Sequence, residues 1–167
     1  MRELILGAGN RSAKILYQES PYFDVPFRVD IDPRCEPDLL WDLNKHPLPI
    51  DDESFDEIHA YEVLEHLGRQ GDWRGFFEEF SDYHRVLKPG GVLFATTPSL
   101  TSPWLWGDPG HTRAISQETL VFLDQQEYVR QVGQTPMTDY RAVYSADFEL
   151  IHAKVRGELF YWGLKKR

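Results

Sequence analysis

Two apolar runs, "FDEIHAY" at 55–61 and "GGVLFATTP" at 90–98, flank a segment with the period of a buried helix. Within that segment the apolar and aromatic side chains recur at spacings of three and four, namely Trp73, Phe76, Phe77, Phe80, Tyr83, His84 and Leu87. Pro89 cannot continue a helix, and Gly90 allows the turn into the second run. The order strand, helix, strand predicts a right-handed crossover and a parallel sheet.

The remaining elements extend this sheet on both sides. "ELILG" at 3–7 and "PFRVDID" at 26–32 are typical of strands, and so are "AVYSADFELIHAKV" at 142–155 and "GELFYWGLKK" at 157–166, which are joined by a hairpin-like reversal. Between them, an amphipathic helix is expected from Ser116, its N-cap, to about Val132, with Glu118 in its first turn. The sequence therefore predicts a mainly parallel α/β sheet with an antiparallel end.

Length, charge and apolar patterning limit the function classes. A chain of 167 residues favours one domain, 1–167, and 41% hydrophobic residues favour a packed core. The net charge is −9, and residues 1–100 hold 19 acidic against 10 basic side chains, so no basic face is evident and nucleic acid is disfavoured as a partner. No apolar run approaches the roughly 18 residues of a membrane span, and a cytoplasmic protein is expected. Cys35 is the only cysteine, which excludes an internal disulfide.

The first apolar run breaks on two glycines, Gly7 and Gly9, in "LILGAGNRSA". A glycine turn after the first strand of an open α/β sheet lets the backbone approach a ligand, although a bare tight turn uses the same residues. Asp30 closes the second strand 21 residues after Gly9, where a carboxylate can accept hydrogen bonds from both ribose hydroxyls of a nicotinamide or adenosyl cofactor. Asp32 is the second candidate, and Asp30 is favoured.

The segments "DLLWDLNKHPLPIDDESFDEIHAYEVLEHL" at 38–67 and "HRVLKPGGVLFATTP" at 84–98 resemble the class I S-adenosylmethionine-dependent methyltransferases. The first strand resembles more narrowly a small subgroup in which this strand ends in Gly-x-Gly-Asn-Arg. The resemblance covers about residues 3–98 and implies an enzyme with S-adenosylmethionine as cofactor and S-adenosylhomocysteine as product. It also implies a Rossmann-like three-layer sandwich around a seven-stranded or slightly reduced sheet. Residues 1–98 would form the cofactor-binding half, and 99–167 the substrate side.

The same resemblance implies a set of cofactor-binding residues, which are Gly7, Ala8, Gly9, Asp30, Ile31, Asp42, Leu43, Tyr61 and Glu62. The glycine turn would contact the methionine part, Asp42 the adenine amino group, and Tyr61 the sulfonium end. Glu62, Glu65 and His66 would border the substrate pocket. Two positions depart from the family pattern, Ile5 in place of an acidic residue and Arg11 in place of a third glycine.

Several of these residues also have a purely structural interpretation. Asp42 can simply cap the turn after its strand, and the "LEH" residues at 64–66 can begin a helix without a chemical role. His59 alternates with apolar neighbours and is interpreted as structural.

The loop "TSPWLWGDPGHTRAI" at 101–115 is the candidate for the acceptor side. Methyl transfer is an in-line displacement, so the enzyme must position the nucleophile and exclude water, and it needs a base only when the nucleophile arrives protonated. Trp104 and Trp106 are predicted to bind substrate, with Arg113 as an anion clamp, and His111 and His66 are the catalytic candidates. A loop whose tryptophans pack on the sheet is the alternative, and no metal is expected.

The acceptor is expected to be a small molecule, a glycan or a lipid-linked intermediate, methylated on oxygen or nitrogen, and a protein acceptor stays open. DNA methylation is disfavoured because "AYEVLEH" stands where amino-methylating enzymes have a Pro-Pro-aromatic turn, and Cys35 does not follow a proline. The alternatives are a cofactor-binding pseudo-enzyme or partner subunit and, with less support, a nicotinamide-linked oxidoreductase. The chain is expected to be a monomer or a homodimer.

Overall fold

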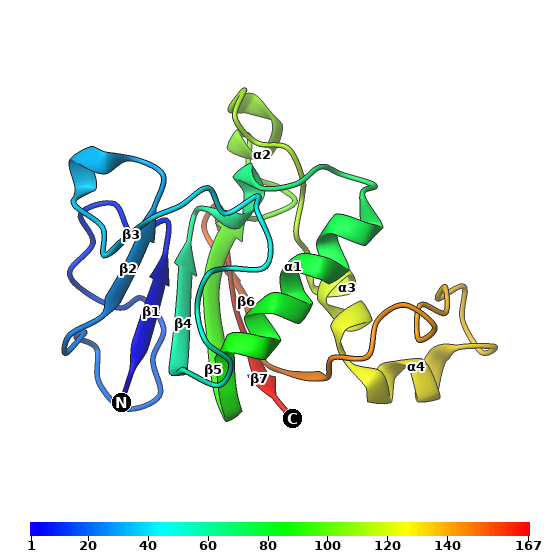
Figure 1. The fold of residues 1–167 in the computed structure, drawn as a ribbon. Helices are drawn as coiled ribbons and strands as arrows, with labels where there is room; N and C mark the ends of the chain where they lie inside the picture. The colour runs from blue at the N-terminus through cyan, green and yellow to red at the C-terminus, as the bar shows by residue number, and fades with distance from the viewer.

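The computed structural model describes residues 1–167 and contains one seven-stranded sheet in the order β3-β2-β1-β4-β5-β7-β6 (Figure 1). The strands are β1 (Glu3–Leu6), β2 (Phe27–Asp30), β3 (Leu39–Leu40), β4 (Phe55–Tyr61), β5 (Leu87–Pro98), β6 (Phe148–Arg156) and β7 (Leu159–Lys166). The first five strands pair in parallel, and β7 runs antiparallel to both β5 and β6. The mainly parallel sheet with an antiparallel C-terminal strand is confirmed.

The helices are α1 (Trp73–Val86), α2 (Trp104–Gly107), α3 (Gln117–Leu120) and α4 (Gln125–Gln131). The predicted crossover helix is α1, which begins after Asp72, whose carboxylate accepts the Gly75 N–H at 3.1 Å. It ends at Val86, and β5 follows at once from Leu87, three residues earlier than the predicted run; Gly90, within this strand, has a φ of 75°. None of the helices is long and apolar enough to cross a bilayer.

The single helix expected over 116–132 is wrong, because the segment is broken in the middle. Ser116 does cap its start in a capping box with Thr119. After α3 a 3-10 turn ends at Leu123, and Asp124 takes an extended conformation in which its carboxylate accepts the Gln126 N–H at 2.8 Å. This local hydrogen bond starts α4 afresh instead of continuing the first helix. The following strand also begins at Phe148, six residues later than expected.

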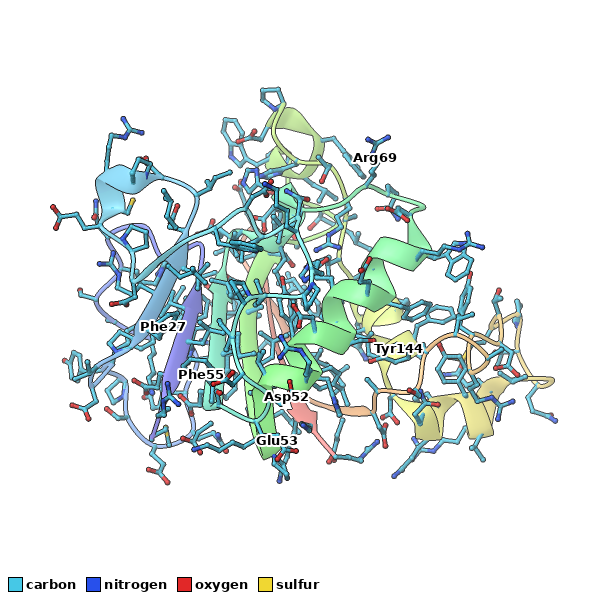
Figure 2. The ribbon with its side chains drawn as sticks, in the orientation of Figure 1. Phe27, Asp52, Glu53, Phe55, Arg69 and Tyr144 are labelled. Atoms are coloured by element: carbon cyan, nitrogen blue, oxygen red, sulfur yellow. The ribbon has the colours of Figure 1, made fainter.

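Helices cover only one face of the sheet (Figure 1). The main core lies there and includes Phe80 of α1, Leu120 of α3 and Trp162 of β7. Figure 2 shows Tyr144 near α1, where its ring lies 4.7 Å from that of Phe77. The opposite face is covered by the irregular segment 7–26, which contributes Ile15, Leu16 and Phe23 to a small cluster with Tyr61, Val92 and Phe94. The third layer is therefore an irregular segment, not a layer of helices.

A buried ionic cluster fixes this segment to the sheet. The Lys14 ammonium binds the carboxylates of Glu3 and Glu57, the latter at 2.8 Å, and His59 Nε2 lies 3.0 Å from Glu57. Burial alone would raise the pKa of Glu57, but the hydrogen bonds from His59 and Lys14 and the Lys14 charge hold it at about 2. Burial lowers the pKa of His59. The structural interpretation of His59 fits this geometry.

These two shifts predict a stability that declines in acid. The unfolded chain takes up a proton on His59 below about pH 6.5 and on Glu57 below about pH 4.5, whereas the folded chain resists both. Urea unfolding at pH 7, 5.5 and 4 should show a falling free energy of unfolding, by up to about 1.4 kcal/mol per pH unit for each proton. The Glu57→Gln variant should show a shallower dependence, and equal slopes would contradict this assignment.

Candidate functional site

The carboxyl ends of β1, β2 and β4 border a cavity of about 320 Å³, which we call the β-edge cavity. It is lined by Gly7, Asp30, Ile31, Trp41, Asp42, Leu43, Asn44, Val63, His66 and Leu67. Five of the residues predicted to bind a cofactor thus meet in one place: Gly7, Asp30, Ile31, Asp42 and Leu43. Parallel strands bring them together because their carboxyl ends share one edge of the sheet.

The glycine turn approaches the chain after β4 so closely that a side chain does not fit. Gly7 has a φ of 60°, and a Cβ built on it would lie 2.4 Å from Cγ2 of Val63. The Gly9 N–H donates a hydrogen bond of 2.8 Å to Oδ2 of Asp30, and the Asp32 N–H donates one of 2.9 Å to Oδ1. Asp30 therefore fixes the turn to the end of β2 while its carboxylate lines the β-edge cavity.

The two acidic alternatives behave differently. Asp32 lies outside the cavity and pairs with Arg34 at 2.6 Å, which agrees with the preference for Asp30. Asp42 accepts hydrogen bonds from the backbone and side-chain N–H groups of Asn44, and these lower its pKa. It caps its turn and lines the β-edge cavity at once, so the structural and functional interpretations are compatible.

Tyr61 packs against Ile15 and Leu16 of the irregular segment and does not line the β-edge cavity. Its hydroxyl donates to the Leu16 carbonyl at 3.0 Å and accepts from the Leu16 N–H at 3.2 Å, while the Arg11 guanidinium lies 5.0 Å from its ring centre. Burial raises the pKa of Tyr61 to about 12, so the phenol is neutral near pH 7. Glu62, which follows, has a φ of 55° and turns the chain toward a second cavity.

This second cavity, of about 470 Å³, is called the loop cavity because the 101–115 loop forms part of its wall. It is lined by Glu62, Glu65, His66, Pro98, Ser102, Trp104, Asp108, His111, Glu158 and Leu159. Both catalytic candidates, His66 and His111, line it together with Trp104. His66 lines the β-edge cavity as well, so the two cavities meet at this residue.

Two predicted acceptor residues do not reach the loop cavity. Trp106 does not line it. Arg113 is 4% exposed, and its guanidinium donates to both carboxylate oxygens of Glu79 on α1, at 2.6 and 2.8 Å, and to the Leu64 carbonyl at 2.8 Å. The expectation of an anion clamp at Arg113 is corrected: its donors are engaged within the protein, where they tie the loop to α1.

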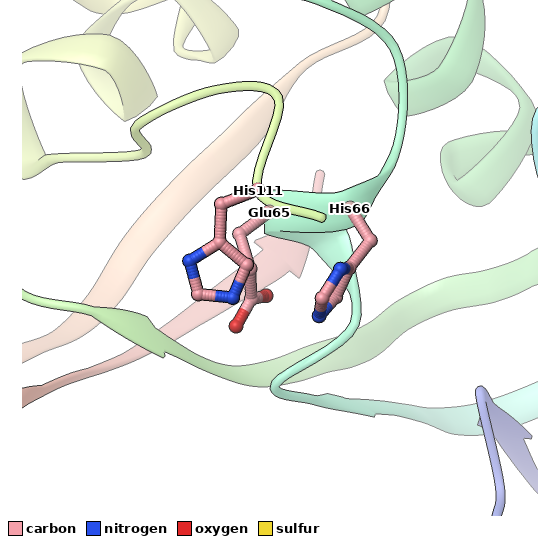
Figure 3. Close-up of side chains that lie close together, drawn as sticks. All are labelled: Glu65, His66 and His111. Atoms are coloured by element: carbon pink, nitrogen blue, oxygen red, sulfur yellow. The ribbon is translucent and has the colours of Figure 1, made fainter. Parts of the chain in front are cut away.

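Glu65 is the residue whose environment the sequence did not disclose. Its carbonyl accepts the Thr112 N–H at 2.8 Å, and its side chain lies close to those of His66 and His111 (Figure 3). Burial raises the pKa of the Glu65 carboxyl to about 7, and its Oε2 has no hydrogen-bond partner. The "LEH" motif at 64–66 indicates Glu65 and His66 as site residues. Nothing in the sequence indicates that the loop at 110–113 places His111 beside them.

Comparison with known proteins agrees with this arrangement. The family model of a methyltransferase domain matches residues 37–95, and no curated protein sequence matches the chain. Similar solved structures include S-adenosylmethionine-dependent methyltransferases from Archaeoglobus fulgidus (16% identity, TM-score 0.60, covering 99% of this chain and 86% of that one) and Mesorhizobium loti (14%, 0.57, 99% and 90%). Another is the N-methyltransferase NodS from Bradyrhizobium japonicum in complex with S-adenosylhomocysteine (14%, 0.56, 99% and 76%).

Proposed function

We propose that this chain, which has the class I methyltransferase fold and a methyltransferase-domain match, moves the methyl group of S-adenosylmethionine to oxygen or nitrogen of an acceptor. The fold and the match support the resemblance to the class I methyltransferases found in the sequence, and they support an enzyme with S-adenosylmethionine as its cofactor. The proposed acceptor is a small molecule, a glycan or a lipid-linked intermediate. The observation that carries the proposal is His66, which lines both cavities, since a donor and an acceptor must meet for in-line transfer.

The residues of the β-edge cavity fit the cofactor. Asp30 and Asp42 place two carboxylates at its wall, able to accept hydrogen bonds from ribose hydroxyls and an adenine amino group. Ile31 and Leu43 add apolar surface for the base, and Gly7 lines the cavity at a position where a Cβ would clash with Val63. When bound, S-adenosylmethionine supplies a methyl group on a positively charged sulfur.

The loop cavity supports a polar acceptor that is neutral or positively charged. Four of its ten lining residues are acidic, Glu62, Glu65, Asp108 and Glu158, and none is lysine or arginine. His111 Nδ1 lies 3.2 Å from the Leu105 carbonyl, which favours the tautomer with the proton on Nδ1 and leaves Nε2 able to accept one. The histidine can therefore take a proton from an acceptor that arrives protonated.

Titration of the purified chain with S-adenosylhomocysteine by calorimetry tests the proposal, with NADH as control ligand. We expect one site with micromolar affinity and no binding of NADH. Binding of NADH alone would favour an oxidoreductase, and binding of neither would overturn the proposal. If S-adenosylhomocysteine binds but no acceptor in a broad panel is methylated without a second protein, the chain is a pseudo-enzyme or partner subunit.

The two loop tryptophans provide a matched test of the acceptor side. Trp104 and Trp106 are both 62% exposed, but only Trp104 lines the loop cavity. Trp104→Ala should raise the KM for the acceptor about tenfold, equivalent to about 1.4 kcal/mol of lost contact, and leave the affinity for S-adenosylhomocysteine unchanged. Trp106→Ala should change KM less than twofold. Equal effects in steady-state assays would remove Trp104 from the acceptor site.

A further inference from the structure

We infer that Glu65, His66 and His111 bind a divalent transition-metal ion in the loop cavity, with a coordination position left open for an oxygen atom of the acceptor. One carboxylate oxygen and one nitrogen from each imidazole all lie within 4.8 Å of one another. The centres of the two imidazole rings are 4.6 Å apart at an angle of 76°, and the Glu65 side chain lies beside them (Figure 3). Ligand atoms that each lie about 2.0–2.2 Å from one ion are at most about 4.4 Å apart, so a bound ion would hold the three side chains at or within their present spacing.

The second nitrogen of each histidine is already oriented as in known metal sites. His66 Nδ1 lies 3.1 Å from the Gly110 carbonyl, and His111 Nδ1 lies 3.2 Å from the Leu105 carbonyl. Donation of Nδ1–H to a backbone carbonyl fixes the ring and leaves Nε2 as an unprotonated ligand, which is the usual outer-shell contact of a metal-bound histidine.

Burial gives an independent indication of a missing cation. Glu65 is only 1% exposed, and its Oε2 has no hydrogen-bond partner. Buried polar atoms are almost always satisfied, so an orphaned carboxylate oxygen facing two imidazoles needs an explanation. The cavity holds three further carboxylates and no lysine or arginine, and Arg113, the nearby cation, is paired with Glu79.

The structure contains a second group of carboxylate and imidazole side chains, and this group already has a cation beside it. Glu3, Glu57 and His59 also place their polar atoms within 4.8 Å of one another. There, however, the Lys14 ammonium binds both carboxylates, so a positive charge is already present. No lysine or arginine side chain forms an ion pair with Glu65 in the structure.

Two imidazoles and one carboxylate favour zinc, iron, cobalt or manganese over magnesium and calcium, which prefer oxygen ligands. Resting on the proposed function, the bound ion would coordinate a hydroxyl oxygen of the acceptor. With the ion bound, His111 Nε2 is a ligand and no longer the proton acceptor, and the hydroxyl loses its proton to water more easily. The bond from that oxygen to the methyl carbon forms as the carbon–sulfur bond breaks, and its electron pair returns to sulfur. The inference thus selects a hydroxyl acceptor within the proposed class.

The test uses the full chain, freed of metal by a chelator and dialysis, and titrated with Zn²⁺ by calorimetry. We expect one Zn²⁺ per chain with micromolar or tighter affinity and much weaker binding of Mg²⁺. Glu65→Gln and His111→Ala should each weaken Zn²⁺ binding at least tenfold, whereas His152→Ala, a histidine on β6 outside both cavities, should not. Unchanged binding in the Glu65 and His111 variants, or more than one equivalent bound to surface sites, would overturn the inference.

A third variant leaves all three ligand side chains in place, so that weaker Zn²⁺ binding can be distinguished from unfolding. A Cβ on Gly110 would lie 3.1 Å from His66 Nδ1, so Gly110→Ala should displace this ring and weaken Zn²⁺ binding several-fold while circular dichroism stays unchanged. Binding of Co²⁺ supplies a visible absorption band that should shift in the same variant. S-adenosylhomocysteine is titrated in parallel: its binding without any Zn²⁺ site refutes the metal inference alone, and Zn²⁺ binding without it refutes the proposed function alone.

Discussion

Replacing Lys14 with methionine is expected to lower the free energy of unfolding by about 3–5 kcal/mol, the usual cost of removing one partner of a buried ion pair. The Lys14 ammonium is fully buried between Glu3 and Glu57, and methionine fills a similar volume without the charge. Both carboxylates would stay buried with only Gln18, His59 and the Asp24 N–H as hydrogen-bond partners. Urea unfolding measured by circular dichroism at pH 7 gives the value.

Lys45→Met is the matched control, because Lys45 is exposed and forms no salt bridge in the structure, and its effect should stay below about 1 kcal/mol. Combining Lys14→Met with Glu57→Gln should cost less than the sum of the two changes, since one of the orphaned charges is then removed. Additive effects would show that the two side chains do not interact.

Asp30→Ala is expected to weaken S-adenosylhomocysteine binding by roughly 10- to 150-fold, the equivalent of about 1.5–3 kcal/mol for hydrogen bonds to a charged group. The variant removes a carboxylate from the wall of the β-edge cavity and also releases the Gly9 N–H that Asp30 holds. Calorimetric titration of the wild-type chain and the variant under the same conditions measures the change.

Asp32→Ala provides the comparison, because Asp32 lies two residues away, pairs with exposed Arg34 and does not line the cavity. The affinity of the Asp32→Ala variant for S-adenosylhomocysteine should stay within about twofold of the wild-type value. Asp30→Asn keeps an oxygen acceptor but not the charge, so its affinity for S-adenosylhomocysteine should lie between those of Asp30→Ala and Asp32→Ala. Equal losses at positions 30 and 32 would contradict the assignment of Asp30.

Sequence periodicity predicted most of the sheet and the crossover helix because each signal is local and strong. α1 repeats its aromatic side chains over almost four turns, and β1 and β5 each contain a continuous apolar stretch, Leu4–Leu6 and Val92–Ala95. The break at Asp124 was missed because a polar residue on a surface helix differs from an N-cap only by its backbone conformation.

The sequence predicts the candidate site only where its residues lie at or next to the ends of strands that local patterns identify. The glycine turn and Asp30 follow from strand ends and spacing, and they do meet at the β-edge cavity. The approach of His111 to Glu65 depends on backbone hydrogen bonds across 47 residues, and the engagement of Arg113 depends on Glu79 in α1. Local sequence patterns do not indicate such long-range pairings. The sequence therefore predicts Arg113 as an anion clamp for the acceptor, although the structure pairs it with Glu79.

The position of His66 between the two cavities has a thermodynamic consequence. A ligand that turns this imidazole from one side alters the wall that the other ligand meets, so the two binding equilibria are linked. Linkage is reciprocal: the factor by which Zn²⁺ changes the affinity for S-adenosylhomocysteine must equal the factor by which S-adenosylhomocysteine changes the affinity for Zn²⁺. A single residue can in this way couple the binding of the donor to the binding of the acceptor.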